Sequence, residues 1–375
     1  MKIAMYGHKK IPSREGGVEI VVEELATRMS KMGNSVVCYN RSSDLKGERR
    51  NLIKRTVFYH GVKLIHVLTI RKKGLAALTS SFVAAYRASK SSADVIHVHA
   101  EGPAATCGFL KLRHKRVIVT IHGLDWQRAK WGKFAKWYLL FGEKQAARHA
   151  DEIIVLSRNM QRYFLEKYGR KTNYIPNGVR QQNRIPAEEI ASCWNLKENA
   201  YVLFVGRLVP EKGLMALVKA WKKVVTDKKL VIVGESSDTE EFCRELRAEA
   251  SDNAHILFTG FVQGKPLQEL FSNAYCYVLP SEIEGMPISL LEAMSYGNCC
   301  LVSSISECTE VIEDKAVVFE KLNCEDLREK LQMLLDHPEV VSFYKKESAE
   351  YITKKYDWDC VVNKTLELYQ DKRER

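Results

Sequence analysis

The sequence contains no hydrophobic run long enough to cross a membrane. The longest candidate, residues 75–86, falls well short of the ~20 apolar residues that span a bilayer, and the basic residues 71–73 precede it. The chain passes from a short strand-like run directly to the basic residues 8–10, without the apolar segment and cleavage site of a signal peptide. These absences predict a cytoplasmic protein.

Metal-binding and ATP-binding patterns are also missing. The ten cysteines form no CxxC pair and have no histidines at zinc-site spacing, so they are expected to be buried free thiols. No G-x-x-x-x-G-K-[ST] pattern occurs, which argues against an ATP-binding phosphate loop. The composition, 46% hydrophobic and 28% charged, is that of a globular protein, and the length of 375 residues predicts two domains.

Charge is distributed unequally along the chain. Residues 1–180 hold 34 Lys and Arg against 13 Asp and Glu, a net charge of +21, whereas the remaining residues carry −9. A basic half predicts an anionic partner: a nucleic acid, an acidic membrane surface or a phosphorylated substrate. A basic surface that is simply solvated is the alternative.

Hydrophobic patterns predict an α/β fold in both halves. Strand-like runs alternate with helical patterns such as 133–149 and 288–296, and a polar stretch at 173–186 separates two such series. This alternation predicts two doubly wound domains, each a parallel sheet covered by helices. Because ligands bind at the carboxyl ends of strands in such sheets, a site is expected in the loops that follow strands.

The segment 206–213 joins a strand to a helix in the second half. It places Arg207 and Lys212 five positions apart in a loop bounded by Gly206 and Gly213. Two cations beside a helix N-terminus suit a pyrophosphate group. A solvated loop with incidental charges explains the spacing equally well.

Two carboxylates mark another strand–helix junction. Pro287 fits the first turn of a helix, which places Glu284 in the loop before that helix and Glu292 in its second turn. Both are therefore expected to face one strand-end crevice, where they can bind sugar hydroxyls and a ribose diol. Complementing the helix dipole explains Glu284 as well, but it does not explain Glu292.

Together these motifs resemble a known family. The E-x7-E pair that ends at Glu292, the G-R-x4-K-G loop at 206–213 and the glycine pair at 16–17 resemble the retaining glycosyltransferases of family 4, which have the GT-B fold. The resemblance covers essentially the whole chain. Residues 14–18 and 122–126 are similar to a bacterial subgroup that assembles surface polysaccharides on lipid carriers, some of whose members transfer rhamnose.

The resemblance implies a domain arrangement and a mechanism. Two Rossmann-like, doubly wound domains would face a cleft: residues 1–180 would bind the acceptor, residues 181–355 the nucleotide-sugar donor, and a helix at 356–375 would return to the first domain. The enzyme would transfer a hexosyl or rhamnosyl group with retention of configuration. No metal or other cofactor would be required, because cations and helix amides neutralise the departing diphosphate, and the D-x-D at 357–359 is not expected to bind metal.

The resemblance also implies roles for particular residues. Arg207 and Lys212 would hold the donor diphosphate, and Glu292 would bind the ribose. The catalytic residues would be His122 and Glu284, both in contact with the transferred sugar. The remaining implied donor contacts are Gly16, Gly17, Phe261, Val262, Gly285, Met286, Pro287 and Ile288.

The basic first domain is expected to dock on an anionic membrane surface. Its cations are mixed with aromatic side chains, a combination that suits anionic lipid and the headgroup region. Asp125, Trp126, Arg128 and Lys130 are expected on the acceptor or membrane side, with Arg71, Lys72, Lys73, Lys111, Arg113, Lys115, Arg116, Trp131, Lys133, Lys136 and Trp137. A lipid-linked saccharide acceptor would then place the protein in the cytoplasm, peripheral on the inner face of the cell membrane. The alternative is that Trp131 and Trp137 are core residues of a helix.

Other functions stay open. A nucleic-acid-binding protein would also be basic, but it explains neither the acidic second half nor the E-x7-E pair, so no nucleic-acid partner is expected. A sugar-nucleotide-binding scaffold would keep Arg207 and Lys212 without using His122. A transferase with a soluble sugar-phosphate acceptor would use the basic domain without a membrane. For an enzyme of capsule, O-antigen or cell-wall polysaccharide synthesis, UDP- or dTDP-sugars are the favoured donors.

Overall fold

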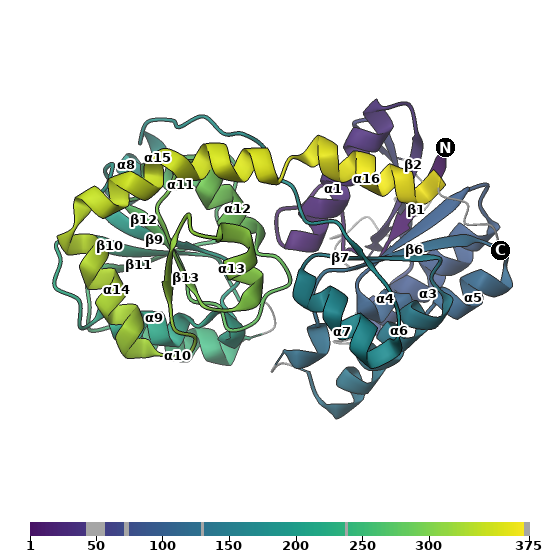
Figure 1. Cartoon of the computed structure of the whole chain (residues 1–375), viewed down its shortest axis with the longest axis horizontal. Helices are drawn as coiled ribbons and strands as arrows, with labels where there is room; N and C mark the ends of the chain where they lie inside the picture. Colours follow the sequence, from purple (N-terminus) through teal and green to yellow (C-terminus); the bar gives the residue numbers. More distant parts are fainter. Residues whose placement is uncertain (43–56, 71–74, 129–130, 237–238, 371–375) are drawn as a thin grey trace. The chain divides into compact units, whose positions relative to one another are not determined.

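The computed structural model describes residues 1–42, 57–70, 75–128, 131–236 and 239–370. These residues form two compact α/β units (Figure 1). Unit 1 consists of Met1–Asn177 with Trp358–Arg375, and unit 2 is the intervening segment Gly178–Asp357. The predicted fold class, two doubly wound Rossmann-like domains, is confirmed.

Unit 1 is built on an eight-stranded sheet. Its strands are β1 (Lys2–Tyr6), β2 (Ser35–Arg41), β3 (Val57–Tyr59), β4 (Val62–Val67), β5 (Val95–His99), β6 (Arg116–Ile121), β7 (Glu152–Val155) and β8 (Asn173–Tyr174). The spatial order is β3-β4-β2-β1-β5-β6-β7-β8, and the strands pair in parallel except β3 with β4. Every residue of β5 is buried, as expected for a strand that helices cover on both faces.

The helices of unit 1 include one from the C-terminal end of the chain. They are α1 (Gly17–Lys31), α3 (Leu75–Lys90), α4 (Glu101–Ala104), α5 (Cys107–Leu112), α6 (Lys133–His149), α7 (Arg158–Tyr168) and α16 (Trp358–Gln370). Figure 1 shows α16, in yellow, beside α1. Arg28 on α1 forms an ion pair with Asp359 on α16, and Arg116 Nη2 donates a hydrogen bond to the Leu368 carbonyl oxygen (2.6 Å). These contacts fasten α16 to unit 1.

Unit 2 is built on a six-stranded parallel sheet. Its strands are β9 (Tyr201–Val205), β10 (Lys229–Val233), β11 (Ile256–Gly260), β12 (Cys276–Leu279), β13 (Cys300–Ser303) and β14 (Val317–Phe319), in the order β11-β10-β9-β12-β13-β14. The helices are α8 (Glu189–Trp194), α9 (Leu214–Trp221), α10 (Glu240–Ala250), α11 (Lys265–Asn273), α12 (Ile288–Ser295), α13 (Ser306–Ile312), α14 (Cys324–Asp336) and α15 (Pro338–Lys355).

Each sheet has a point at which the strand order changes direction. In unit 1, β1 lies between β2 and β5, and in unit 2, β9 lies between β10 and β12. At such a switch point the loops after neighbouring strands lead to helices on opposite faces, which opens a crevice that binds ligands. The loops after β1 and β5 in unit 1, and after β9 and β12 in unit 2, are therefore where a site is expected.

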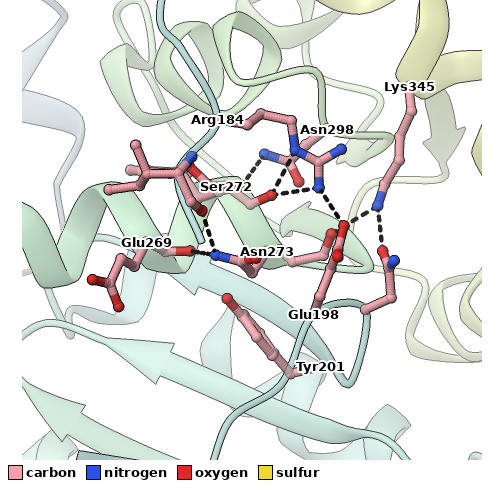
Figure 2. Close-up of polar contacts among 12 residues, drawn as sticks. Arg184, Glu198, Tyr201, Glu269, Ser272, Asn273, Asn298 and Lys345 are labelled. Carbon is pink, nitrogen blue, oxygen red and sulfur yellow. Dashed lines mark hydrogen bonds and ion pairs between the residues drawn. The ribbon is translucent and has the colours of Figure 1, made fainter. Parts of the chain in front are cut away.

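A polar network joins the segment that enters unit 2 to the residues just before β12, at the amino ends of the strands (Figure 2). Arg184 Nε donates to the Ser272 carbonyl oxygen (2.8 Å), and Asn273 Nδ2 donates to the Ile185 carbonyl oxygen (3.0 Å). Burial and the nearby Arg184 lower the pKa of Lys345, on α15, to about 8. Ser272 and Asn273 precede β12, so this network lies away from the carboxyl ends of the strands and serves the fold.

The structure bears on the expectations about membrane-spanning segments and about the cysteines. Within the described ranges, no helix combines the length and the hydrophobicity that a membrane crossing requires. The cysteines are free thiols, but Cys193 and Cys360 are exposed. The expectation of burial is therefore wrong for these two, because their helices turn them toward solvent.

Candidate active site

Two predicted donor-site residues form an ion pair at the switch point of unit 2. Lys212 lies in the loop from β9 to α9, and Glu284 lies in the loop from β12 to α12. The Lys212 ammonium contacts Glu284 Oε1, and the two side chains are 12% and 10% exposed. The fold thus brings together a cation and a carboxylate that are 72 positions apart in the sequence.

Close backbone contact aligns these two loops. Gly213 has a φ of +67°, and a Cβ there would lie 2.0 Å from the Pro280 carbonyl oxygen, so glycine is required. The Glu282 amide donates to the Glu211 carbonyl oxygen (2.9 Å). The last glycine of the G-R-x4-K-G loop therefore has a structural role, because it lets the β9–α9 loop pack against the β12–α12 loop.

Helix α12 carries the second carboxylate of the E-x7-E pair. Pro287 occupies the position just before the helix, and Glu292 lies half-buried in the second turn. The predicted backbone contacts lie where the loop meets the helix: Gly285, Met286 and Pro287 are buried, and Ile288 is half-buried. The two carboxylates therefore flank the first turn of α12, as the sequence spacing predicts.

The other predicted donor residues are spread along the same edge of the sheet. Arg207, half-buried, is the second residue after β9. Phe261 and Val262 follow β11, which is two strands away from β9, and Phe261 is 43% exposed. At a strand spacing of ~4.8 Å, the two loops are about 10 Å apart. This separation suits a nucleotide that extends from its diphosphate to its base.

In unit 1 the predicted glycine pair lies at the start of α1. Gly16 immediately precedes α1 and Gly17 is its first residue. A Cβ at Gly16 would lie 2.4 Å from Glu19 Oε2. The Glu19 side chain is 6% exposed, and its Oε1 accepts a hydrogen bond from the Lys9 amide (2.8 Å). Glu19, which the sequence analysis missed, therefore holds the β1–α1 loop against the helix.

His122 follows β6 and contacts a second histidine. His99, the last residue of β5, is fully buried, and its Nδ1 lies 3.1 Å from His122 Nε2. His97 lies on the same face of β5, and its ring nitrogens contact the Tyr369 hydroxyl (2.5 Å) and Thr120 Oγ1 (2.7 Å). The sequence analysis noted His97 and His99 on one strand face but did not connect them to His122.

Burial keeps this group of histidines neutral. It lowers the pKa of His122 to about 4 and the pKa of His97 to about 3, and it lowers the pKa of His99 well below its ordinary value. His8, in the loop after β1, has its pKa lowered to about 4 by burial, and its Nε2 lies 2.9 Å from Asn40 Oδ1. The carboxyl-end loops of unit 1 therefore present uncharged imidazoles near neutral pH.

The loop after β6 also contains the residues predicted on the acceptor or membrane side. Asp125 Oδ1 lies 3.0 Å from Arg128 Nη2. Lys167 on α7 lies 5.3 Å from the centre of the Trp126 ring. Lys130 lies outside the described residues. Asp125, Trp126 and Arg128 are thus held by contacts within unit 1.

Two buried carboxyl groups lie on the helices that follow β5 and the β6 loop. Glu101 and Glu143 are fully buried. Burial, with the nearby Asp125 and Glu143, raises the pKa of Glu101 well above its ordinary value. Glu143 Oε1 accepts hydrogen bonds from the Tyr163 hydroxyl (2.8 Å) and from Lys167 Nζ (2.9 Å). The sequence analysis missed both groups, because an isolated glutamate in a helix predicts a surface position.

Two domain families match the chain in succession. The family described as Glycosyltransferase Family 4 matches residues 15–182, and the family described as Glycosyl transferases group 1 matches residues 188–358. The first match lies in unit 1 and reaches the start of unit 2, and the second lies almost entirely in unit 2.

Individual proteins with similar sequences or structures agree with these matches. The chain is 26% identical over 330 residues to alpha-maltose-1-phosphate synthase of Mycobacterium tuberculosis, covering 79% of this chain and 83% of the relative. Its fold resembles sucrose-phosphate synthase from Thermosynechococcus elongatus, with a TM-score of 0.83 and 22% identity over 98% of both chains. It also resembles Anabaena HepE in complex with UDP-glucose, with a TM-score of 0.80 and 16% identity over 98% of this chain and 99% of that one.

The family matches and the shared fold agree with each other. The chain belongs to the glycosyltransferases with the GT-B fold, of the family 4 and group 1 type.

Proposed function

We propose that this glycosyltransferase transfers a sugar, with retention of configuration, from a UDP- or dTDP-sugar to a saccharide acceptor carried on a lipid. The cations at the switch point of unit 2 and the UDP-glucose bound by HepE support a nucleotide-sugar donor. The proposal assigns the diphosphate to Arg207 and Lys212, the ribose to Glu292 and the transferred sugar to Glu284 and His122.

Lys212 has to change partner in this mechanism. Lys212 is paired with Glu284 in the structure, and in this proposal the donor diphosphate takes the place of the carboxylate beside the ammonium. Glu284 would then accept hydrogen bonds from hydroxyl groups of the sugar. The exchange couples donor binding to the placement of the catalytic carboxylate, so neither residue acts alone.

The chemical step is a front-face substitution in this proposal. The bond between the anomeric carbon and the diphosphate oxygen breaks, and the acceptor oxygen bonds to the anomeric carbon from the same face. The proton of the acceptor hydroxyl passes to the departing diphosphate. Arg207 and Lys212 stabilise the negative charge that grows on the diphosphate, and the proposal uses no metal or further cofactor.

An exposed row of aromatic side chains carries the proposal of a lipid-linked acceptor. Phe134, Trp137 and Phe141 on α6 are 73%, 60% and 39% exposed, and successive ring centres lie 5.8 and 5.9 Å apart. Their spacing of three and four positions places them on one helix face, which exposed Lys144 and Arg148 continue. We call these three rings the aromatic ridge. Exposed indole and phenyl rings beside cations suit the headgroup region of anionic lipid.

Some of the side chains that the sequence assigns to the membrane side have partners within the protein. Trp137 is exposed, so the alternative that it belongs to the core is wrong. Lys111 pairs with Asp151 (2.8 Å), and Lys115 Nζ donates to the Ser91 carbonyl oxygen (2.8 Å). These two lysines, like Arg116 beside α16, serve the fold. Residues 71–73 lie outside the described residues, so the proposal depends on α6.

Vesicle binding tests this part of the proposal. The wild-type chain is expected to sediment with vesicles that contain anionic phospholipid, and the triple variant Phe134→Ser/Trp137→Ser/Phe141→Ser is expected to stay in solution. Phe58→Ser removes a ring that is 68% exposed on β3 and is the matched control, because it lies outside α6. Unchanged vesicle binding by the triple variant would contradict the membrane-docking proposal.

A soluble sugar-phosphate acceptor is the second candidate. Two of the similar proteins, alpha-maltose-1-phosphate synthase and sucrose-phosphate synthase, are named for sugar phosphates, and the basic first half of the chain would attract such an anion. Transfer from radiolabelled UDP-glucose separates the candidates. Label on a glycosylated sugar phosphate in the aqueous phase supports the soluble acceptor. Label on a lipid-linked saccharide, recovered by extraction into organic solvent, supports the first proposal.

A further inference from the structure

His99 and His122 are in direct contact through their ring nitrogens. The two ring centres lie 5.3 Å apart, the ring planes are inclined by 29°, and His99 Nδ1 lies 3.1 Å from His122 Nε2. A hydrogen bond between two imidazoles needs one protonated and one unprotonated nitrogen. Burial lowers the pKa of both rings well below neutrality, so each ring carries a single N–H group and only two arrangements are possible.

In the first arrangement, His99 donates from Nδ1. Its Nε2 is then an unprotonated acceptor, and the proton of His122 must lie on Nδ1. In the second arrangement, His122 donates from Nε2. His99 must then carry its own proton on Nε2, and His122 Nδ1 becomes an acceptor. The two arrangements give His122 opposite hydrogen-bonding character at the nitrogen that does not face His99.

The surroundings of His99 distinguish these arrangements. His99 Nε2 is fully buried and has no hydrogen-bond partner among the described residues. A buried N–H group without a partner is rarer than a buried acceptor without one. His8 also influences the electrostatics of His99. The Nε2–H group of His8 donates to Asn40 Oδ1, which leaves His8 Nδ1 unprotonated, but the described contacts include no hydrogen bond between His8 and His99. The first arrangement is therefore favoured.

The backbone holds His99 in this position. Gly7 has a φ of +117°, and a Cβ there would lie 2.1 Å from the His99 carbonyl oxygen, so the β1–α1 loop packs directly against the end of β5. The amide of Ala100 donates to the Thr120 carbonyl oxygen (2.9 Å), which ties the end of β5 to the strand that leads to His122. Because the backbone is held and the ring is fully buried, His99 has little freedom to exchange its two nitrogens by rotation.

We propose that His99 is a positioning residue that fixes His122 in the tautomer with its proton on Nδ1, so that His122 offers a hydrogen-bond donor to an oxygen of the sugar. The inference rests on the proposed function only in naming the sugar as the partner. A neutral His122 with Nδ1 protonated and Nε2 occupied by His99 has no nitrogen available to accept a proton. His122 would therefore orient the substrate and would not act as a general base.

Nitrogen NMR of the full chain tests the tautomer directly. Protein labelled with 15N-histidine gives long-range proton–nitrogen correlations that identify which ring nitrogen carries the proton. A His122→Gln variant assigns the His122 signals by their loss. Protonated Nδ1 in both His99 and His122 at pH 7.5 is the expected result. Protonated Nε2 in His122 would overturn the inference, whether or not the protein transfers sugar.

Variants of His99 test its effect on turnover. His99→Phe removes the donor and is expected to lower kcat about fivefold to tenfold, with the KM for the nucleotide sugar changed less than about twofold. His99→Asn supplies an amide N–H near the place of Nδ1 and is expected to restore most of kcat. Equal losses in both variants would contradict a positioning role through the Nδ1 donor.

His97→Phe is the matched control for stability. His97 is as buried as His99, but its ring nitrogens contact Tyr369 and Thr120 and not His122. The His122 signals are expected to keep their tautomer in His97→Phe and to become a mixture in His99→Phe. A similar mixture in both variants would show that the effect reflects loosening of the strand, and would overturn the inference. Absence of transfer in a wild-type protein that has the expected tautomer would contradict the proposed function alone.

Discussion

The two units differ in the charge of the side chains assigned to the donor sugar and diphosphate, and the difference is opposite to that between the two halves of the sequence. The first half carries +21, yet His99 at the end of β5 and His122 just after β6 are neutral imidazoles. The second half carries −9, yet its switch point holds the cations Arg207 and Lys212. Net charge describes the surface of a domain, whereas the strand-end loops decide what its site can bind. In the proposed mechanism, Arg207 and Lys212 of unit 2 neutralise charge, and His122 of unit 1 forms an uncharged hydrogen bond.

Removing the Lys212–Glu284 ion pair is expected to have the largest effect on stability and on nucleotide-sugar affinity. Lys212→Met leaves the part-buried Glu284 carboxylate without its partner, which is expected to cost about 1–3 kcal/mol of stability. It also removes a diphosphate contact, so nucleotide-sugar affinity is expected to fall about 100-fold.

A double variant separates these two effects. Lys212→Met/Glu284→Gln is expected to regain most of the stability, because the unpaired charge is gone, but to bind the nucleotide sugar as weakly as the single variant. Thermal unfolding and calorimetry measure the two quantities. If the double variant regained nucleotide-sugar affinity together with stability, Lys212 would have a purely structural role and would not bind the diphosphate.

The neutral histidines of unit 1 predict a pH dependence of its stability. His8, His97, His99 and His122 have lower pKa values in the folded chain than the ordinary 6.5, so the unfolded chain binds protons first as pH falls. The contribution of these histidines to the free energy of unfolding is complete above about pH 6.5. It is lost as the pH falls toward 4, at up to about 1.4 kcal/mol per histidine per pH unit. Glu101, whose pKa is raised, opposes this trend as a single group.

Hydrogen exchange followed by mass spectrometry locates this effect. Between pH 7.5 and 5.5, after correction for intrinsic exchange rates, the free energy of opening is expected to fall in the peptides of β5 and β6 and to change less in those of β9 and β12. His97→Gln should reduce the slope in unit 1, because one buried imidazole is removed. If the free energy of opening fell with pH only in the peptides of unit 2, the buried histidines would not be the source of the pH dependence.

His122→Ala is expected to have an intermediate effect, and mainly on turnover. Removal of an uncharged hydrogen bond to the sugar should lower kcat about tenfold, while donor affinity changes less than about twofold, because the diphosphate contacts are retained. Steady-state kinetics beside calorimetry with the nucleotide sugar make this comparison. A loss of affinity as large as the loss of kcat would place His122 among the donor-binding residues.

Phe261→Ala is expected to have the smallest effect. Phe261 is 43% exposed after β11, where the proposal places the nucleobase, and loss of one aromatic contact should weaken nucleotide binding about threefold. Phe343→Ala, which removes a ring that is 58% exposed on α15, is the control. Equal affinity in both variants would move the nucleobase away from β11.

Sequence patterns predicted the parts of the molecule that local spacing determines. The helical periods of α6 and α12 and the positions of Glu284 and Glu292 on either side of a helix start follow from residues within one or two turns. The fold class followed from the alternation of strands and helices, because such sheets have few alternatives. Gly213 was visible as a motif residue, but its role in packing against Pro280 depends on a strand 63 or more positions further along the chain.

Contacts between distant residues could not be predicted. The Lys212–Glu284 pair and the His99–His122 contact join loops that only the strand order brings together. Composition also could not show that Lys111 is paired with Asp151 while Trp137 is exposed. A single sequence shows which charges are present, and the fold decides which of them are neutralised within the protein.

The most direct test of the account is thermal unfolding with UDP, dTDP, GDP and ADP, for the wild-type chain and for Arg207→Ala and Glu292→Ala. A nucleotide at about 100 times its Kd stabilises the protein by about 2.7 kcal/mol. The account predicts an increase in Tm with UDP or dTDP that both variants abolish, because the diphosphate and the ribose are bound at the switch point of unit 2. An equal increase in all three proteins, or no increase with any nucleotide, would contradict it.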